Sequence, residues 1–461
     1  MSDIIFVSKI AEAAIFEQVF NHFVKNDLWH PNHHGFKPGH STATALTQMY
    51  DLWIREAEDR KLSAALLLDL SAAFDVVDHN ILLDKLQLYK FDPEAISWFK
   101  SYLSDRRQYV MVESSLSDPR PVGEQSVPQG SLLGPLLFII FYNNFPTSRE
   151  EGTSVLYADD DTDIVADENI EDLRHKIQRE ADLSTAWVRD NKLVCSGKKT
   201  KLLIIGTKEL KKARQKDHKV EIVVAGHTVK ESDSERLLGV IVNNTLTWEH
   251  HLYGNDEFQG LVPKLSQRAN LILKLSFVMP RERLRILAEG IFFSTLNYCI
   301  QVYGNVWGLT EYSEQENKSI AFTKDDNRRL QILMNKVLRA LTGLDYDTPI
   351  SQLIALTGQL SVHQRTAYHT ITSMHKTIQS GLPRYNSVKL EESRPHRITD
   401  MRATERYRVD YNLSVSRCSY FYRGSRLINL LPENVFQART LPTFKKRAKG
   451  WVQNNIPVLP P

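Results

Sequence analysis

The chain has 461 residues, of which 42% are hydrophobic and 25% are charged, which is typical of a globular protein with two or three domains. Its formal net charge is only +3, so a nucleic-acid partner would be bound by local basic patches and not by the field of the whole molecule. The three cysteines follow no metal or disulfide spacing, which excludes a cysteine-rich zinc module and fits a reducing compartment.

No apolar run reaches the roughly 18 residues that a membrane span requires, and the N-terminus lacks a signal-peptide pattern. We therefore expect an intracellular, soluble protein without a membrane partner. No localisation signal distinguishes the nucleus from the cytoplasm.

The first half of the chain alternates helical and strand patterns. Residues 5–28 and 41–60 predict two helices, and the apolar run 62–70 predicts a buried strand with Asp69 near its end. Further helices are predicted at 81–88, 93–103 and 170–187, and further strands at 108–112, 201–205, 220–224 and 237–242. The lysine-rich segment 208–219 is expected either to contact a nucleic-acid backbone or to be an exposed, mobile hairpin tip.

Long helical patterns dominate from about residue 261 onward. Apolar residues recur at helical spacing there, and two later stretches, 328–341 and 349–380, have the same pattern. The polar stretch 311–324 is expected to be a linker or insertion. The tail from about residue 382 is rich in Arg, Tyr, Ser and Pro, so we expect little regular structure in it.

Two adjacent carboxylates, Asp159 and Asp160, follow Tyr157 and Ala158 in a turn between two apolar arms of a predicted hairpin. Asp69 precedes Asp159 by 90 residues at a strand terminus. Nucleotidyl transfer by two metal ions needs carboxylates that converge on cations roughly 3.5 to 4 Å apart, so this arrangement points to a polymerase. Taken singly, Asp69 reads as a helix cap and the Asp-Asp pair as an acidic hairpin turn.

Two further motifs lie between these carboxylates. Phe74 follows Asp69 by five residues. In a polymerase an aromatic ring at this place can lie under the sugar of a nucleotide and clash with a 2′-hydroxyl. The alternative interpretation is that Phe74 is a residue of the hydrophobic core. Gln129 and Gly130 offer a side-chain amide and a backbone that tolerates close approach, and their alternative is an ordinary turn. Lys199-Thr200 follows the acidic pair.

In this order the motifs resemble the reverse transcriptases of non-LTR (LINE-type) retrotransposons, over almost the whole chain. Segment 35–42 resembles that family's fingers motif, 68–79 and 157–160 resemble its two catalytic motifs, 127–134 resembles its template-and-nucleotide grip, and 238–248 resembles its turn into the thumb. The resemblance implies an α+β right-hand polymerase with an antiparallel palm sheet, partial fingers and a helical thumb. The expected domains are a fingers-palm domain (1–250), a helical thumb-like domain (251–380) and an irregular C-terminal extension (381–461).

The resemblance also implies roles for single residues. Asp69, Asp159 and Asp160 would be catalytic and would bind two Mg²⁺ ions, for which Mn²⁺ is a possible substitute. Phe74 would exclude ribonucleotides, and Gln129 and Gly130 would position the nucleotide and the template.

Several lysine and arginine residues are candidates for contacts with phosphate groups. Lys199 would lie near the triphosphate, with a surface lysine as the equal alternative. Candidates for phosphate contacts, with solvated faces as the alternative, are Arg106, Arg107, Lys264, Arg268 and Lys274. The implied partners are an RNA template, a DNA primer and deoxynucleoside triphosphates.

Two departures from the family pattern bear on activity. Asp161 stands between the acidic pair and Thr162, so the hairpin must absorb it as a bulge or slip by one residue, and a third carboxylate adds repulsion. The match begins at about Val7, without the upstream fingers strand and endonuclease domain of the family, which is typical of a truncated copy. The two hypotheses are an RNA-directed DNA polymerase and a catalytically impaired relic that binds RNA or primer-template.

Overall fold

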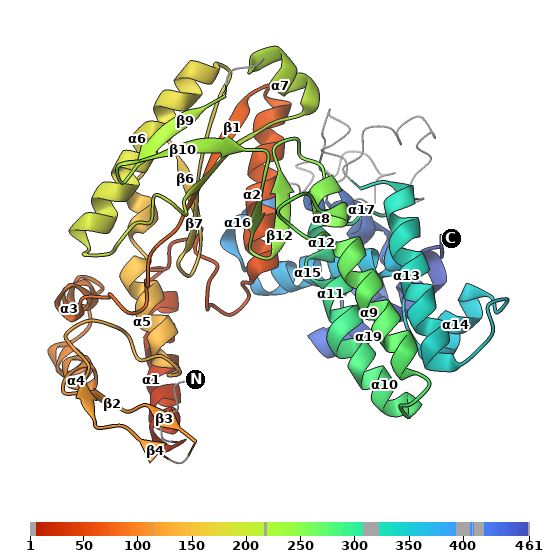
Figure 1. The fold of residues 1–461 in the computed structure, drawn as a ribbon, viewed down its shortest axis with the longest axis horizontal. Helices are drawn as coiled ribbons and strands as arrows, with labels where there is room; N and C mark the ends of the chain where they lie inside the picture. The colour runs from red at the N-terminus through yellow and green to blue at the C-terminus, as the bar shows by residue number, and fades with distance from the viewer. Residues whose placement is uncertain are drawn as a thin grey trace. The chain divides into compact units, whose positions relative to one another are not determined.

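The computed structural model describes residues 6–113, 115–215, 219–307, 322–392, 406–407, 409 and 419–459 (Figure 1). The chain divides into two compact units, each built from separate segments: 1–41, 63–202 and 217–231 in the first, and 42–62, 203–216 and 232–461 in the second. Each unit is described by itself. The predicted domain boundaries at residues 250 and 380 stay predictions.

A six-stranded sheet carries the segments that contain the predicted catalytic carboxylates. Its strand order is β6 (Thr153–Tyr157), β7 (Asp160–Asp167), β1 (Leu62–Leu68), β8 (Lys201–Ile205), β10 (His227–Ser232) and β9 (Glu221–Val224). The β6–β7 and β9–β10 pairs are antiparallel. The sheet therefore places β1, which leads into Asp69, directly beside β7, which begins at Asp160.

The helices of the first unit follow from local sequence signals. The helix α5 (Leu133–Tyr142) is apolar all round and is correspondingly buried along its length, whereas the amphipathic α6 (Ile170–Asp190) packs one face on β7 and β9 (Figure 1). Aspartate N-caps start α3 (His79–Leu88) and α4 (Pro93–Leu103). The remaining helices are α1 (Phe6–Lys25) and the short η1 (Phe145–Ser148).

The strand predicted at 108–112 is not continuous. The chain forms two short ribbons, in which β2 (Arg107–Gln108) pairs with β5 (Arg120–Pro121) and β3 (Met111–Val112) pairs with β4 (Ser115–Leu116). All four strands are exposed, so no buried face fixes one long register.

The second unit is mainly helical. Before residue 300 it contains α2 (Thr42–Glu58), α7 (Lys208–Arg214), α8 (Glu249–Tyr253), α9 (Leu261–Leu275), α10 (Arg281–Ala288), the π-helical η2 (Glu289–Phe293) and α11 (Ser294–Asn297). After it come α12 (Ile300–Tyr303), α13 (Lys324–Thr342), α14 (Ile350–Thr357), α15 (Val362–Ser380) and α16 (Arg384–Glu392). Residues 208–214 of the segment predicted as a hairpin tip form α7, which Thr207 caps, and residues 216–218 lie outside the described residues. Most of the predicted linker 311–324 also lies outside them.

The strand predicted at 237–242 is wrong, because the chain turns back in the middle of it. Strand β11 (Ser234–Leu237) pairs with β12 (Val240–Asn243) across Leu238 and Gly239, whose φ angles of 46° and 82° are both positive. Positive φ at both central residues is typical of the tight turns that close two-residue hairpins.

The prediction of an irregular tail is wrong, because the described part of the tail after residue 419 contains three further helices. The tail forms α17 (Tyr420–Leu430), α18 (Glu433–Phe436) and α19 (Leu441–Asn455). Phe444 and Val452 are fully buried against Ile371 and Met374 of α15. The Arg- and Tyr-rich composition concealed this pattern. One of these arginines, Arg423, is buried and donates hydrogen bonds to the carbonyls of Gln301 and Gly304.

The predicted α+β fold with an antiparallel catalytic sheet is confirmed by these elements. None of the described helices combines the length and the apolar character needed to cross a membrane.

Candidate active site

The acidic turn closes the β6–β7 hairpin with two residues, Ala158 and Asp159. Tyr157 lies opposite Asp160, and Leu156 lies opposite Asp161, so the register is regular. Ala158 adopts the left-handed conformation that such a turn requires (φ 60°). The extra carboxylate Asp161 is thus not absorbed by a bulge.

Asp69 follows β1 and is held by a returning loop. The backbone N–H of Ser196 donates to the Asp69 carbonyl (2.8 Å), and the Asp69 N–H donates to the Thr200 hydroxyl (3.3 Å). Lys199 Nζ lies 3.7 Å from Asp69 Oδ1, with both side chains substantially exposed. The structure therefore joins the predicted Lys199 to a predicted catalytic carboxylate.

The three predicted carboxylates interact electrostatically. Burial raises the pKa of Asp159, and the charge of Asp69 raises it further. Burial, and then the charges of Asp159 and Asp69, raise the pKa of Asp160 to about 6. Repulsion of this kind requires that the side chains lie near one another.

A donor set of carboxylate oxygens suits a hard divalent cation, which would also relieve this repulsion. However, nowhere in the described chain are three or more His, Cys, Asp or Glu side chains already arranged to hold a metal ion. The carboxylates fit a divalent metal by chemistry, and they would have to converge when the metal binds.

The loop before the fingers motif supports the acidic turn. His34 N–H donates to the Leu156 carbonyl (2.7 Å), and Leu156 N–H donates to the Asn32 carbonyl (2.9 Å). Gly35 then approaches so closely that a Cβ at this position would lie 2.4 Å from Ala158 N. Sequence reasoning placed Gly35 in a motif but missed this contact, since a single sequence carries no sign of its neighbour.

Phe74, Gln129 and Gly130 are brought together around the turn after β1. The half-buried Phe74 stacks on Phe138 with ring centroids 4.2 Å apart, and its carbonyl accepts from Val127 N–H (3.0 Å). Gln129 is exposed and its Nε2 donates to Asp75 Oδ1 (2.7 Å). Gly130 has φ +83°, a conformation that favours glycine.

Arg106 and Arg107 lie where α4 leads into the exposed ribbon. Arg106 lies over the Tyr102 ring at 5.9 Å, and Arg107 is paired with Pro121. Within the described residues, no recorded interaction links either arginine to the carboxylates, so their phosphate-binding role stays a prediction.

A buried polar cluster beneath the turn was not predicted. Asp163 accepts hydrogen bonds from Arg149 (2.9 Å) and from the Ser184 hydroxyl (2.6 Å). Asp161, two residues earlier on the same strand face, is 2% exposed, and neither of its carboxylate oxygens has a hydrogen-bond partner in the described structure. Burial, and then the charge of Asp163, raise the pKa of Asp161 well above its ordinary value.

Residues 4–242 match the family model described as reverse transcriptase (RNA-dependent DNA polymerase), which is more than half of the chain. The chain belongs to the reverse transcriptase family. All three predicted catalytic carboxylates lie inside the matched segment.

This reverse transcriptase chain is similar to polymerases of insect mobile elements. It is 24% identical over 74% of its length to the probable RNA-directed DNA polymerase from transposon BS of Drosophila melanogaster, covering 35% of that protein. It is 26% identical over 74% of its length to the probable RNA-directed DNA polymerase from transposon X-element of Drosophila melanogaster, covering 35% of it. The corresponding values for mobile element jockey of Drosophila melanogaster are 24%, 67% and 31%. These relatives confirm the predicted likeness to LINE-type enzymes, and the chain spans about a third of their length.

Among solved structures, apo telomerase from Candida tropicalis matches 82% of this reverse transcriptase chain and 60% of its own, with 12% identity and a TM-score of 0.38. The Candida tropicalis telomerase in complex with a fragment of telomeric RNA gives the same TM-score and identity, over 83% and 56% of the two chains.

Proposed function

We propose that this chain is an RNA-directed DNA polymerase that adds deoxynucleotides to a primer 3′-end, with Asp69, Asp159 and Asp160 as its catalytic carboxylates. The observation that carries the proposal is the electrostatic coupling of these three side chains at the ends of neighbouring strands. The proposed template is RNA, and the proposed substrates are a DNA primer end and deoxynucleoside triphosphates.

The proposed cofactor is a pair of Mg²⁺ ions, with Mn²⁺ as a substitute, held by Asp69 and Asp159 and supported by Asp160. When bound, the ions would activate the primer 3′-hydroxyl and neutralise charge on the triphosphate. The supporting carboxylate must also be ionised, so we expect metal binding to weaken below about pH 6, where Asp160, whose pKa is raised to about 6, takes up a proton.

Three neighbouring residues would complete the site. Lys199, now 3.7 Å from Asp69, would turn to the triphosphate once a metal neutralises that carboxylate. Phe74, fixed by its stacking on Phe138, would meet the sugar of the incoming nucleotide. Gln129, fixed by Asp75, would position the base pair.

The second candidate function is binding of RNA or primer-template without turnover. Asp161 favours it, because a buried carboxyl group without a hydrogen bond costs roughly 1–3 kcal/mol and lies directly beneath the catalytic turn. A hairpin weakened in this way would hold Asp159 and Asp160 less rigidly.

Primer extension separates the two. The assay uses poly(rA) with an oligo(dT) primer, dTTP and Mg²⁺, and compares the wild type with Asp159→Ala and with Asp84→Asn, which changes an exposed aspartate on α3. Extension that Asp159→Ala abolishes and Asp84→Asn retains establishes the polymerase. A folded wild type that extends nothing yet retards primer-template in a salt-sensitive gel shift contradicts the polymerase and supports binding alone.

A further inference from the structure

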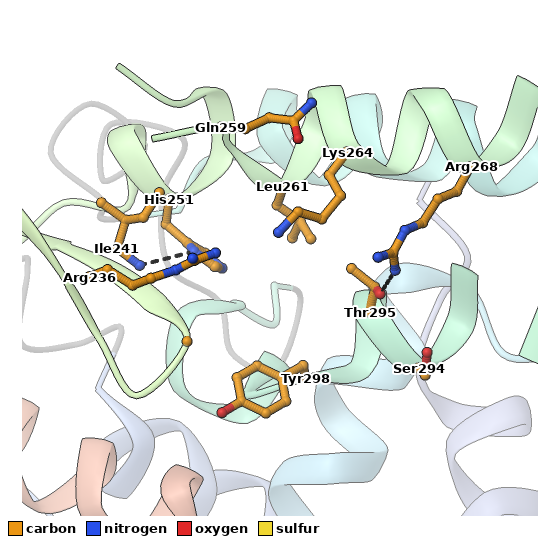
Figure 2. Close-up of a pocket in the computed structure, with 11 residues that line it drawn as sticks. Arg236, Ile241, His251, Gln259, Leu261, Lys264, Arg268, Ser294, Thr295 and Tyr298 are labelled. Carbon is orange, nitrogen blue, oxygen red and sulfur yellow. Dashed lines mark hydrogen bonds between the residues drawn. The ribbon is translucent and has the colours of Figure 1, made fainter. Parts of the chain in front are cut away.

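A pocket of about 350 Å³ lies within the second unit, between the β11–β12 hairpin and the helices α9 and α11. Figure 2 shows Arg236 reaching into it from the hairpin, and Lys264 and Arg268 reaching into it from α9. Tyr298 lies below these side chains in the same view. Lys264 and Arg268, two of the residues that the sequence offers as candidates for phosphate contacts, line this pocket, whereas none of the proposed catalytic or nucleotide-positioning residues does.

The pocket carries positive charge that nothing in it neutralises. Among the described residues that line it, three are Arg or Lys and none is Asp or Glu. Arg268 is anchored by its hydrogen bonds to the Ile291 carbonyl and the Thr295 hydroxyl, whereas Arg236 and Lys264 form no recorded ion pair or side-chain hydrogen bond in the described chain. Burial, and then the charges of Arg236 and Arg268, lower the pKa of Lys264, so the cations repel one another.

His251 adds a neutral donor to the same wall. It is 7% exposed, and its Nδ1 accepts a hydrogen bond from Ile241 N–H (3.3 Å), so the neutral ring carries its proton on Nε2. That Nε2 is buried and has no hydrogen-bond partner in the described structure. A buried donor left without a partner is uncommon in a folded protein and points to a missing acceptor.

We propose that this pocket is an anion site that takes a phosphate group, with Arg236 and Lys264 supplying charge and His251 supplying a hydrogen bond. Guanidinium and ammonium groups make charge-assisted hydrogen bonds to phosphate oxygens. The volume is near the lower end of the roughly 300–1,000 Å³ of small-ligand sites, so it admits a phosphate or a pyrophosphate. The same chemistry is presented by a free phosphorylated ligand or by a phosphate of a nucleic-acid strand.

Titration calorimetry with sodium pyrophosphate tests the site. The buffer contains EDTA, so that metal-bound pyrophosphate at the carboxylates does not contribute. We expect Lys264→Gln and Arg236→Gln each to weaken pyrophosphate binding by about tenfold, since each removes a charge-assisted hydrogen bond. Arg283→Gln, which changes an exposed arginine on α10, should bind as the wild type does.

Asp159→Ala separates this proposal from the proposed function, because it should abolish extension and leave pyrophosphate binding unchanged. The source of the phosphate is read from fluorescence anisotropy of a labelled primer-template. If the two pocket variants also weaken duplex binding and pyrophosphate competes with the duplex, the site takes a strand phosphate. If duplex binding is unchanged while pyrophosphate binding falls, it takes a free ligand.

The proposal is overturned if the folded wild type binds no pyrophosphate and the variants bind the duplex normally. Equal pyrophosphate binding by the wild type and both pocket variants overturns it as well. Thermal melting of each variant shows that it is folded, and the two single substitutions are independent, so one unstable variant leaves the test intact.

Discussion

Gly35→Ala should impair the catalytic turn from a position that carries no chemistry. A Cβ at residue 35 would lie 2.4 Å from Ala158 N and 3.1 Å from Ala158 Cα, and both contacts are to backbone atoms that no rotamer change can move. Ordinary contact begins at 3.4 Å, so one of the two backbones must shift by about 1 Å. Ala158 is bonded to Asp159, so the shift reaches a proposed metal-binding carboxylate directly.

A displacement of this size costs a rate factor of about 10² when it moves a catalytic group, and overpacking costs about 1–3 kcal/mol of folding free energy. We expect Gly35→Ala to lower the single-turnover rate of dTTP addition by that factor, with a lower unfolding midpoint in urea. The control is Gly123→Ala, because a Cβ at Gly123 meets no atom within 4 Å. It should retain the wild-type rate and stability.

Wild-type rate and stability in Gly35→Ala would show that the loop at Asn32–Gly35 does not hold the turn. A loss of rate that Gly123→Ala shares would show that the assay responds to any glycine substitution. The stability measurement needs no turnover, so it tests the contact even in a chain that extends no primer.

Four more substitutions test other parts of the first unit. Phe74→Val should let UTP compete with dTTP about tenfold better in primer extension, since it removes the ring proposed to meet a 2′-hydroxyl. Asp161→Val should raise the free energy of unfolding by about 1–3 kcal/mol in urea titrations at pH 7, because it removes a buried carboxyl group without a hydrogen bond. Asp163→Asn breaks the buried ion pair with Arg149 and should lower the free energy of unfolding by about 3–5 kcal/mol. Burial lowers the pKa of Lys37 from 10.5 to about 7, so between these pH values the folded protein binds fewer protons than the unfolded chain. The free energy of unfolding should therefore rise by up to about 1.4 kcal/mol per pH unit from pH 7 to 9. Lys37→Met should remove this rise.

Each of these expectations has an opposite result. An unchanged preference for dTTP in an active Phe74→Val would make Phe74 a core residue only. Destabilisation by Asp161→Val would mean that its carboxyl group makes a stabilising interaction. Parallel stability curves for Lys37→Met and the wild type between pH 7 and 9 would mean that Lys37 stays charged in the folded protein.

Local patterns in the sequence predicted the elements that the catalytic site rests on. The apolar run before Asp69 and the two arms around Asp159 and Asp160 are β1, β6 and β7 in the structure, because strand character and turn chemistry are encoded within a few residues. The order of these motifs also predicted that the three carboxylates share a site. Their electrostatic coupling agrees with that prediction.

Contacts between distant segments were beyond the reach of the sequence. The Gly35–Ala158 approach and the Lys199–Asp69 ion pair each join residues more than a hundred positions apart, and either partner alone reads as an ordinary turn glycine or surface lysine. The prediction of an irregular tail was wrong for a related reason. The apolar positions of the tail helices are recognisable only once α15 is known, because Phe444 and Val452 pack against it.

The extra residue Asp161 lowers the stability of the hairpin and does not interrupt its strand pairing. A bulge would have interrupted the ladder beside Asp159 and Asp160, yet the hairpin keeps a two-residue turn and a regular register. The extra carboxyl group therefore takes a buried strand position, beside Asp163 and without a hydrogen bond. Since the geometry of the acidic pair is kept and the cost falls on the stability of the strand beneath it, restoring an apolar residue at position 161 should strengthen the catalytic hairpin without altering its chemistry.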